Sequence, residues 1–160
     1  MKTLILYATK YGASAEIARR ISAKFPNATV FNLKTDKIPP LDDFDCVIVG
    51  GSLYAGMLRK EAKKFVSENA TVLGNQRLGL FLSGLSKNDE GSESQKAFTE
   101  NFPQSILQSA KATAFLGGIF DPAKAKGVDK FIFKAVTKQS DYTNTISDER
   151  IDMFVSELLS

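Results

Sequence analysis

The sequence predicts a doubly wound α/β domain, in which a parallel sheet carries helices on both faces. Two observations predict this class. Short apolar runs alternate with amphipathic segments along the chain, as in strands joined by crossover helices. Glycine and hydroxyl residues also gather directly after three of the apolar runs, where such sheets bind ligands. A chain of 160 residues with 43% hydrophobic content can bury one sizeable core, so we expect a single domain over 1–160.

Five apolar runs have the length of strands that are buried on both faces, and right-handed crossovers between them give a parallel sheet. The expected strands are 3–7, 28–33, 46–49, 78–83 and 112–116. Three other segments space their apolar residues as one face of a helix. These faces are Ile17, Ala18, Ile21 and Phe25; Leu58, Ala62, Phe65 and Val66; and Ile151, Phe154, Val155 and Leu158. A further helix is expected over about 93–102, before Pro103.

The loop after the first strand predicts an anion site. It consists of Thr9, Lys10, Tyr11, Gly12, Ala13 and Ser14, and it leads directly into the first helix. Backbone N–H groups and the positive end of a helix converge at such a point, where a phosphate can bind. Neither G-x-x-x-x-G-K-[ST] nor G-x-G-x-x-G is present, so the loop suits a monoester phosphate better than a triphosphate or a dinucleotide. Alternatively, Thr9 and Ser14 only cap the helix.

Two further loops meet the first at the carboxyl edge of the expected sheet. One follows the third strand and contains Gly51, Ser52, Leu53, Tyr54, Ala55 and Gly56; the other follows the fourth strand and contains Ser83, Gly84, Leu85 and Ser86. Ligands of doubly wound sheets bind where such loops converge. Tyr54 can stack on a planar heterocycle there, or it can be a surface residue that covers the adjacent helix.

Absent residue types exclude several classes of enzyme. The chain contains no histidine, so a Ser-His-Asp or Cys-His arrangement is impossible, and we expect no metal site. Its one cysteine, Cys46, lies in the apolar run 44–49, which favours a buried thiol over a nucleophile. An organic cofactor would supply its own chemistry. We expect no nucleic-acid partner, and a cytoplasmic protein, because the chain shows neither a signal peptide nor the roughly 18 apolar residues of a membrane span.

The first loop resembles the flavodoxin signature. The matching residues, after two apolar positions, are Tyr7, Thr9, Gly12, Ser14, Ala18 and Ile21. Ser14 stands where the family usually has threonine, and Leu85 stands near a position where many flavodoxins have an aromatic residue. The resemblance implies the strand order 2-1-3-4-5 and non-covalent binding of flavin mononucleotide (FMN). It places the phosphate in the first loop and the isoalloxazine ring at the other two.

A basic segment distinguishes the chain from typical flavodoxins, which are strongly acidic. Residues 121–138 contain five lysines and two aspartates, and they carry the whole net charge of +3. Within an insert expected around 121–146, one helical face is formed by Val128, Phe131, Ile132, Ala135 and Val136. Such a helix suits a membrane surface or a partner, or it covers the sheet as an ordinary surface helix. Its candidate contact residues are Lys124, Lys126, Lys130 and Lys134.

The insert resembles that of the menaquinone-dependent protoporphyrinogen oxidases, a flavodoxin-like group. The similarity lies in residues 129–136, in the opening 1–6 and in 142–145. It implies oxidation of a porphyrinogen-type substrate with a quinone as electron acceptor, with a peripheral contact to the membrane. The residues alone leave three functions open: this oxidoreductase, a soluble electron carrier without a substrate of its own, and an interaction module that binds no flavin.

Overall fold

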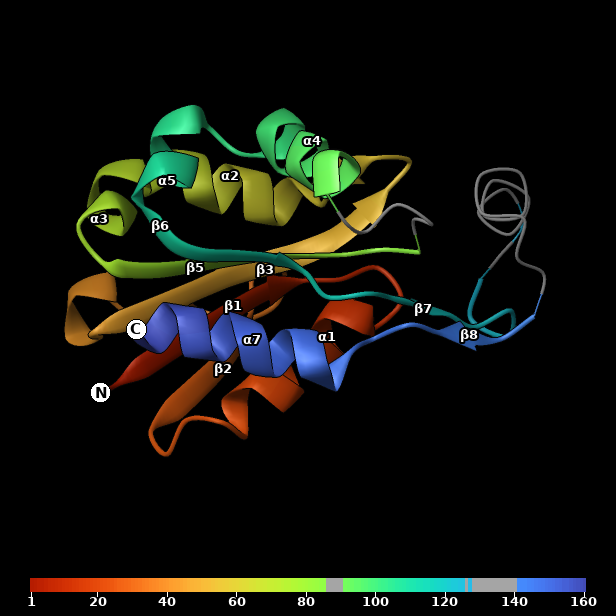
Figure 1. Ribbon diagram of the computed structural model, residues 1–160, viewed down its shortest axis with the longest axis horizontal. Coiled ribbons are helices and arrows are strands. Elements are labelled where there is room, and N and C mark those ends of the chain that lie inside the picture. Colours follow the sequence, from red (N-terminus) through yellow and green to blue (C-terminus); the bar gives the residue numbers. More distant parts are fainter. Residues whose placement is uncertain (86–90, 126, 128–140) are drawn as a thin grey trace.

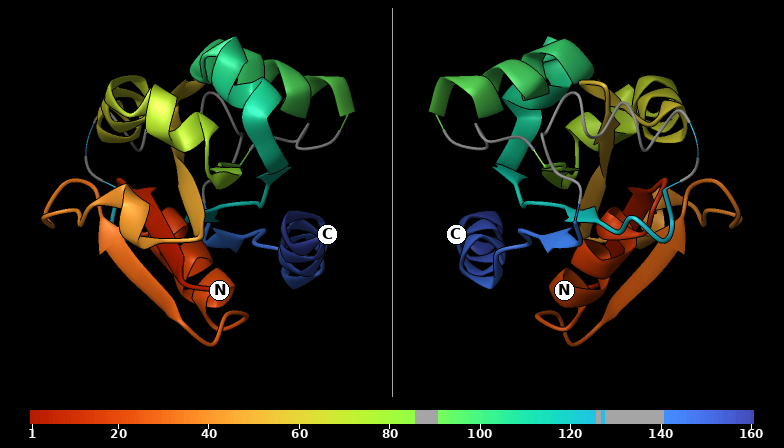
Figure 2. Two further views of the ribbon diagram at one scale, coloured as in Figure 1. Left: turned by 90° about the vertical axis from the view of Figure 1, so that its left-hand side faces the viewer. Right: turned by 90° about the vertical axis from the view of Figure 1, so that its right-hand side faces the viewer.

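A central parallel sheet lies between two layers of helices in the computed structural model, which describes residues 1–85, 91–125, 127 and 141–160 (Figure 2). The sheet consists of β1 (Thr3–Ala8), β2 (Ala28–Asn32), β3 (Cys46–Tyr54), β5 (Arg77–Ser83) and β6 (Ala110–Phe115). These strands are parallel and follow the order β2-β1-β3-β5-β6. Counted along the parallel strands, this is the order 2-1-3-4-5, so the expected fold class is confirmed.

Helices cover both faces of the sheet (Figure 1). On one face lie α1 (Ala13–Ser22) and α7 (Asp148–Leu159); on the other lie α2 (Lys60–Glu68), α3 (Ala70–Gly74), α4 (Gly91–Asn101) and α5 (Gln104–Ser109). A single 3-10 turn, η1 (Leu41–Asp43), precedes β3. The helices expected within the described residues are present as α1, α2, α4 and α7. Apolar spacing does not predict α3 and α5, because five or six residues are too few to establish a helical period.

The third strand is longer than expected. It does not end at Val49, because its backbone pairs with β5 as far as Ser52 and then with the short antiparallel β4 (Met57–Leu58). Most of the loop expected over 50–56 is therefore strand, and only Ala55 and Gly56 form the turn. Leu58 was expected on a helix face but belongs to β4, and α2 begins two residues later.

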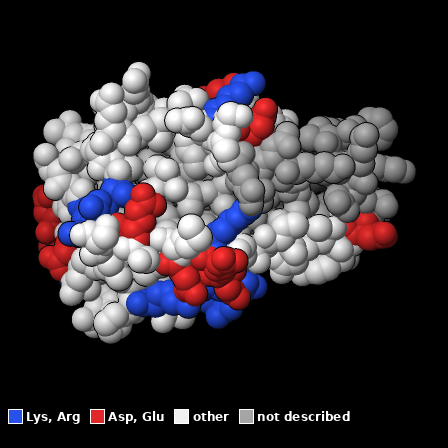
Figure 3. All heavy atoms as spheres, viewed as in Figure 1, with Lys and Arg blue, Asp and Glu red and all other residues white. Residues whose placement is uncertain are grey.

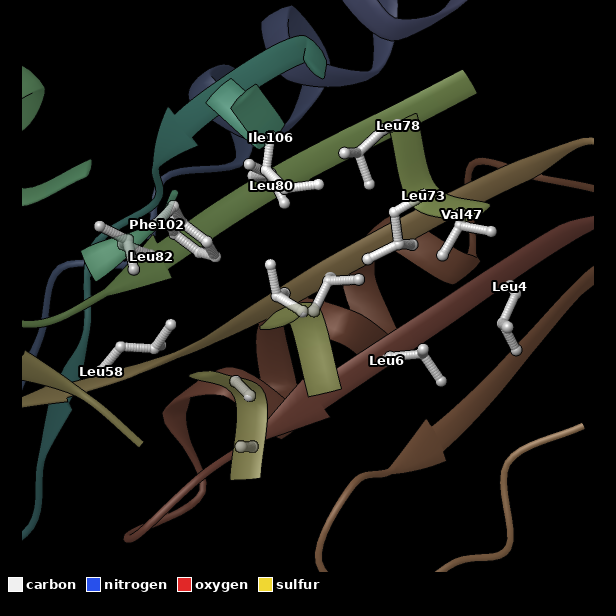
Figure 4. Packing of buried hydrophobic residues seen from close by; sticks show 14 of the residues in the cluster. Leu4, Leu6, Val47, Leu58, Leu73, Leu78, Leu80, Leu82, Phe102 and Ile106 are labelled. Carbon is white, nitrogen blue, oxygen red and sulfur yellow. The ribbon is translucent and has the colours of Figure 1, made fainter. Parts of the chain in front are cut away.

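The three central strands, β1, β3 and β5, are buried on both faces, as their nearly continuous apolar runs predict. The edge strands β2 and β6 were expected to be buried in the same way but are partly exposed, because each has a neighbouring strand on one side only. Leu4 and Leu6 of β1 belong to the cluster on the side of α2 to α5, whereas Ile5 belongs to the cluster on the side of α1 and α7. Figure 4 shows part of the first cluster, where leucines of the strands meet Leu73 of α3 and Ile106 of α5. Because both faces are covered, a ligand reaches this sheet only at its edges and at the ends of its strands.

Cys46 is buried in the cluster beside α1 and α7, as expected. Burial raises the pKa of its thiol to about 11. The thiol therefore stays protonated at neutral pH and is a poor nucleophile.

The expected basic helix falls on residues outside those described, together with Lys126, Lys130 and Lys134. What the structure describes is the base of the insert. There β7 (Ile119–Phe120) and β8 (Thr143–Asn144) pair antiparallel at the end of the molecule where the strands of the sheet finish (Figure 1). The chain therefore leaves and re-enters the domain at one place beside that edge. No helix within the described ranges is long and apolar enough to cross a membrane.

Candidate functional site

Three strands end side by side and bring the expected loops together. Ala8 at the end of β1 is in register with Gly51 of β3, and Ser52 of β3 is in register with Ser83 at the end of β5. Gly51 leaves no room for a side chain, because a Cβ there would lie 2.7 Å from the Leu58 side chain and 3.2 Å from the Ala8 carbonyl oxygen. The residues that follow β1, β3 and β5 therefore face one region at the carboxyl edge.

Three serine hydroxyls connect α1 to the ends of β3 and β5. The Ser14 Oγ lies 2.7 Å from the Ser52 Oγ and 3.0 Å from the Ser83 Oγ, and the Ser83 hydroxyl donates to the Ser52 Oγ at 3.2 Å. Ser14 and Ser83 are fully buried. Each hydroxyl can donate once around this triangle, so all three are satisfied without water. The Ser14 hydroxyl thus attaches the start of α1 to the sheet.

The 9–14 loop is closed by Thr9 and turned by Gly12. The Gly12 N–H donates to the Thr9 Oγ1 at 2.9 Å. Gly12 is the N-cap residue of α1 and has a φ of 96°, a left-handed conformation in which other residues are strained. Since neither Thr9 nor Ser14 occupies the N-cap position, simple capping does not explain their hydroxyls. The first-turn N–H groups of α1 and the positive end of its dipole point toward the loop, as an anion site requires.

Lys10 lies between two tyrosines at this edge. Its Nζ is 3.7 Å from the centre of the Tyr54 ring and 5.5 Å from the centre of the Tyr11 ring, within the range of cation–π contacts. A cavity of about 30 Å³ is lined by residues from all three loops. Its lining residues are Lys10, Tyr11, Ala13, Ser52, Leu53, Tyr54, Ser83, Gly84, Leu85, Gly118 and Ile119.

Nine of the expected site residues therefore line one cavity. Of the others, Ala55 and Gly56 form the exposed turn after β3, and Ser86 lies outside the described residues. The cavity has about the volume of one water molecule. In this conformation the Lys10 ammonium covers one face of the Tyr54 ring, so a planar ring can stack on that face only if this flexible side chain withdraws.

Gly118 and Ile119 were not among the expected site residues. They follow β6 and reach the cavity because the backbone of Gly118 packs on that of Gly84, where a Cβ on Gly118 would lie 2.7 Å from the Gly84 carbonyl carbon. The Gly84 N–H also donates to the Gly117 carbonyl at 3.0 Å. The adjacent Gly117 and Gly118 are the sequence feature that could have indicated this contact, because paired glycines often permit close backbone approach.

A shallower groove of about 550 Å³ lies between α1 and the β7–β8 ribbon, and the exposed Lys124 lines it. Its arginines are already paired. Hydrogen bonds from Arg19 and Arg20 hold the pKa of Glu16 at about 2, and Arg20 also contacts Asp148 at 3.0 Å. Figure 3 shows acidic and basic side chains intermingled on the face that carries α7. The arginines beside the loop therefore add little net positive charge to this groove.

The residues at the carboxyl edge fit FMN. The 9–14 loop offers backbone N–H groups and the Thr9 hydroxyl to a phosphate, and Lys10 offers a positive charge. Tyr54 and Leu85 offer apolar surface for a planar ring. Among the described residues, no group of three acidic, histidine or cysteine side chains is placed to hold a metal ion.

A family model described as a flavodoxin domain matches residues 4–147. The chain belongs to the flavodoxin family. Family membership confirms the resemblance seen in the 9–14 loop, and it supports FMN as the cofactor of an oxidoreductase.

Individual flavodoxin relatives are distant in sequence. The chain is 24% identical to the protoporphyrinogen IX dehydrogenase (quinone) of Escherichia coli K12 over 146 residues, which are 88% of this chain and 81% of that protein. It also resembles the solved structures of oxidised flavodoxin 2 and flavodoxin 1 of Bacillus cereus. Flavodoxin 2 matches with a TM-score of 0.59 and 18% identity, over 99% of this chain and 98% of that one. Flavodoxin 1 matches with a TM-score of 0.59 and 14% identity, over 99% and 97%. These two structures establish the shared fold.

Proposed function

We propose that this flavodoxin binds FMN at the carboxyl edge of its sheet and oxidises a porphyrinogen-type substrate, with a quinone as electron acceptor. The observation that carries the proposal is the match to a quinone-linked protoporphyrinogen IX dehydrogenase over 88% of this chain and 81% of that protein. The basic segment 121–138 supports it, because porphyrinogens carry carboxylates that lysines attract. The base of this insert adjoins Gly84 through Gly118, which lines the candidate site.

FMN, when bound, supplies the redox chemistry, since it accepts electrons from a reduced substrate and passes them on. The chain itself binds the cofactor and adjusts its environment. The 9–14 loop holds the phosphate, and Tyr54 covers the ring. Lys10, which lies beside Tyr54 in this conformation, brings a positive charge to the site, and a positive charge favours the reduced and more negative cofactor. The chain contains no histidine, so proton transfer at the site does not use an imidazole.

A soluble electron carrier is the second candidate. The observation that favours it is the match to two solved flavodoxins over nearly the full length of both chains. A carrier passes electrons between protein partners and has no small-molecule substrate. The two candidates therefore differ in what the reduced protein reacts with.

Turnover with a quinone separates these candidates. We expect the FMN-loaded protein to convert a porphyrinogen into fluorescent porphyrin at a rate that saturates with both the porphyrinogen and a naphthoquinone. Boiled protein and free FMN at equal concentration are the controls. Porphyrin formation no faster than with free FMN, together with rapid reduction of a protein acceptor such as a cytochrome, would favour the carrier. Purified protein that neither contains nor takes up a yellow flavin would contradict both candidates.

We further propose that the basic insert contacts anionic membrane at its surface. Replacing Lys126, Lys130 and Lys134 by glutamate should abolish flotation with anionic vesicles at low salt and slow quinone reduction, while FMN affinity stays unchanged. Each lysine near such a surface contributes about 1 kcal/mol, and salt screens this attraction. The matched control replaces the same lysines by arginine, which keeps the charge. Wild-type protein that ignores anionic vesicles at low salt would make the insert an ordinary surface element.

A further inference from the structure

Asn101, the last residue of α4, makes three hydrogen bonds that connect this helix to the turn between β3 and β4. Its Oδ1 accepts from the Leu58 N–H at 2.8 Å. Its Nδ2 donates to the carbonyl oxygens of Gly56 at 3.1 Å and of Ala97 at 2.8 Å. Asn101 is only 6% exposed. Because the amide uses its oxygen and both of its N–H groups, the orientation of the side chain is fully determined.

The turn that Asn101 holds is strained. Ala55 has a φ of 50° and Gly56 a φ of 77°, and Ala55 is the one non-glycine residue with positive φ in the part of the chain that is described. Residues with a Cβ are unfavourable in this conformation, so the surrounding structure must hold them there. The Gly56 carbonyl and the Leu58 N–H lie on either side of the exposed Met57. Asn101 therefore makes hydrogen bonds to the backbone on both sides of Met57.

The held turn adjoins the candidate site, and the helix that holds it is well anchored. Leu53 and Tyr54 line the cavity and directly precede the turn. Phe98 of α4 stacks on Phe102 with ring centres 5.8 Å apart. Both rings belong to the same buried cluster as Leu58, part of which Figure 4 shows. A movement of the turn relative to α4 would therefore displace Tyr54.

We propose that Asn101 is a positioning residue of the flavin site, which holds the Ala55–Gly56 turn, and through it Tyr54, in the conformation that receives the isoalloxazine ring. The inference rests on FMN binding in the proposed function, and it adds a residue from outside the three loops. The hydrogen bonds of Asn101 hold the turn that follows Tyr54, and none of them involves the 9–14 loop. Asn101 should therefore affect FMN and riboflavin equally, and it should also affect the reduction potential, which depends on the groups that surround the ring.

The test compares Asn101→Ala with Asn69→Ala. Asn69 makes the same local bond, from its Nδ2 to the carbonyl of Phe65 four residues earlier at 2.8 Å, but it belongs to the end of α2. We expect both variants to lower the unfolding temperature. Only Asn101→Ala should weaken FMN and riboflavin binding, by about tenfold each in fluorescence-quenching titrations, and shift the midpoint potential in a redox titration. Asn101→Ala with the flavin affinities and potential of Asn69→Ala would overturn the proposal.

Asn101→Asp is the second variant, in case the alanine variant does not fold. It keeps the acceptor for the Leu58 N–H but sets an oxygen against the Gly56 carbonyl, so we expect the same losses of flavin affinity. A measurement on the wild type needs no variant: riboflavin should slow hydrogen exchange at the Leu58 amide, and unchanged exchange would overturn the proposal. If the wild-type protein binds riboflavin but oxidises no porphyrinogen, the proposed activity fails and the role of Asn101 still stands. Flavin affinity, midpoint potential and hydrogen exchange are all measured without turnover.

Discussion

Removing the phosphate of FMN should weaken its binding to this protein by roughly a hundredfold to ten-thousandfold, measured by titrating the apoprotein with FMN and with riboflavin. The expected contacts are N–H groups at the start of α1 and the hydroxyl of Thr9. Charge-assisted hydrogen bonds of this kind are worth about 1.5–3 kcal/mol each, so two of them account for the range. Equal affinities for the two flavins would contradict the assignment of the phosphate to the 9–14 loop.

Thr9→Ala should remove part of this preference. The Thr9 Oγ1 accepts the Gly12 N–H at 2.9 Å, so the substitution releases the turn and also removes a hydroxyl from the loop. We expect FMN affinity to fall about tenfold while riboflavin affinity stays almost unchanged. Thr9→Ser keeps the hydroxyl and is the control. A parallel loss for both flavins would show that Thr9 acts on the ring and not on the phosphate.

Gly117→Ala should destabilise the protein by about 3 kcal/mol or more, measured by urea unfolding of the apoprotein. Gly117 is buried and has a φ of 87°. A Cβ there would overlap the carbonyl of Thr145 and lie 2.8 Å from the Ile146 nitrogen. These are backbone atoms, which cannot rotate away as a side chain can. The Gly117 carbonyl also accepts from the Gly84 N–H, so any shift disturbs the candidate site as well.

Gly91→Ala is the matched control for this prediction. Gly91 also has a positive φ, 64°, but a Cβ there would meet nothing within 4 Å. Only the cost of the left-handed conformation applies, roughly 1 kcal/mol. If the two variants unfold at the same urea concentration, the packing of Gly117 against residues 145–146 contributes nothing to stability.

Much of the fold could be predicted because burial on both faces leaves a strong pattern. Leu4, Ile5 and Leu6 are consecutive and fully buried, on alternating sides of β1, so the strand reads as an unbroken apolar run. The helix faces could be predicted equally well, because Ile17 and Ile21 repeat at the helical period and both are fully buried in α1. These signals are local, and a sequence displays them directly.

The extent of β3 could not be predicted in the same way. Gly50 and Gly51 have the composition of a loop, yet both pair within the sheet. They are glycines because of packing: a Cβ on Gly50 would overlap the Phe81 ring, and a Cβ on Gly51 would crowd the Leu58 side chain. Since those neighbours come from other strands, local composition suggested a loop where the structure has a strand.

The candidate site also contains features that residue order predicts and features that only the folded structure decides. Residue order alone was sufficient to place Thr9, Gly12 and Tyr54 at one edge of a parallel sheet, because the carboxyl ends of such strands must meet there. It did not reveal which partner each polar group takes. The hydroxyl of Ser14 meets serines 38 and 69 positions away, at Ser52 and Ser83. Such pairings depend on the register of strands that are distant in the chain, and only the folded sheet decides them.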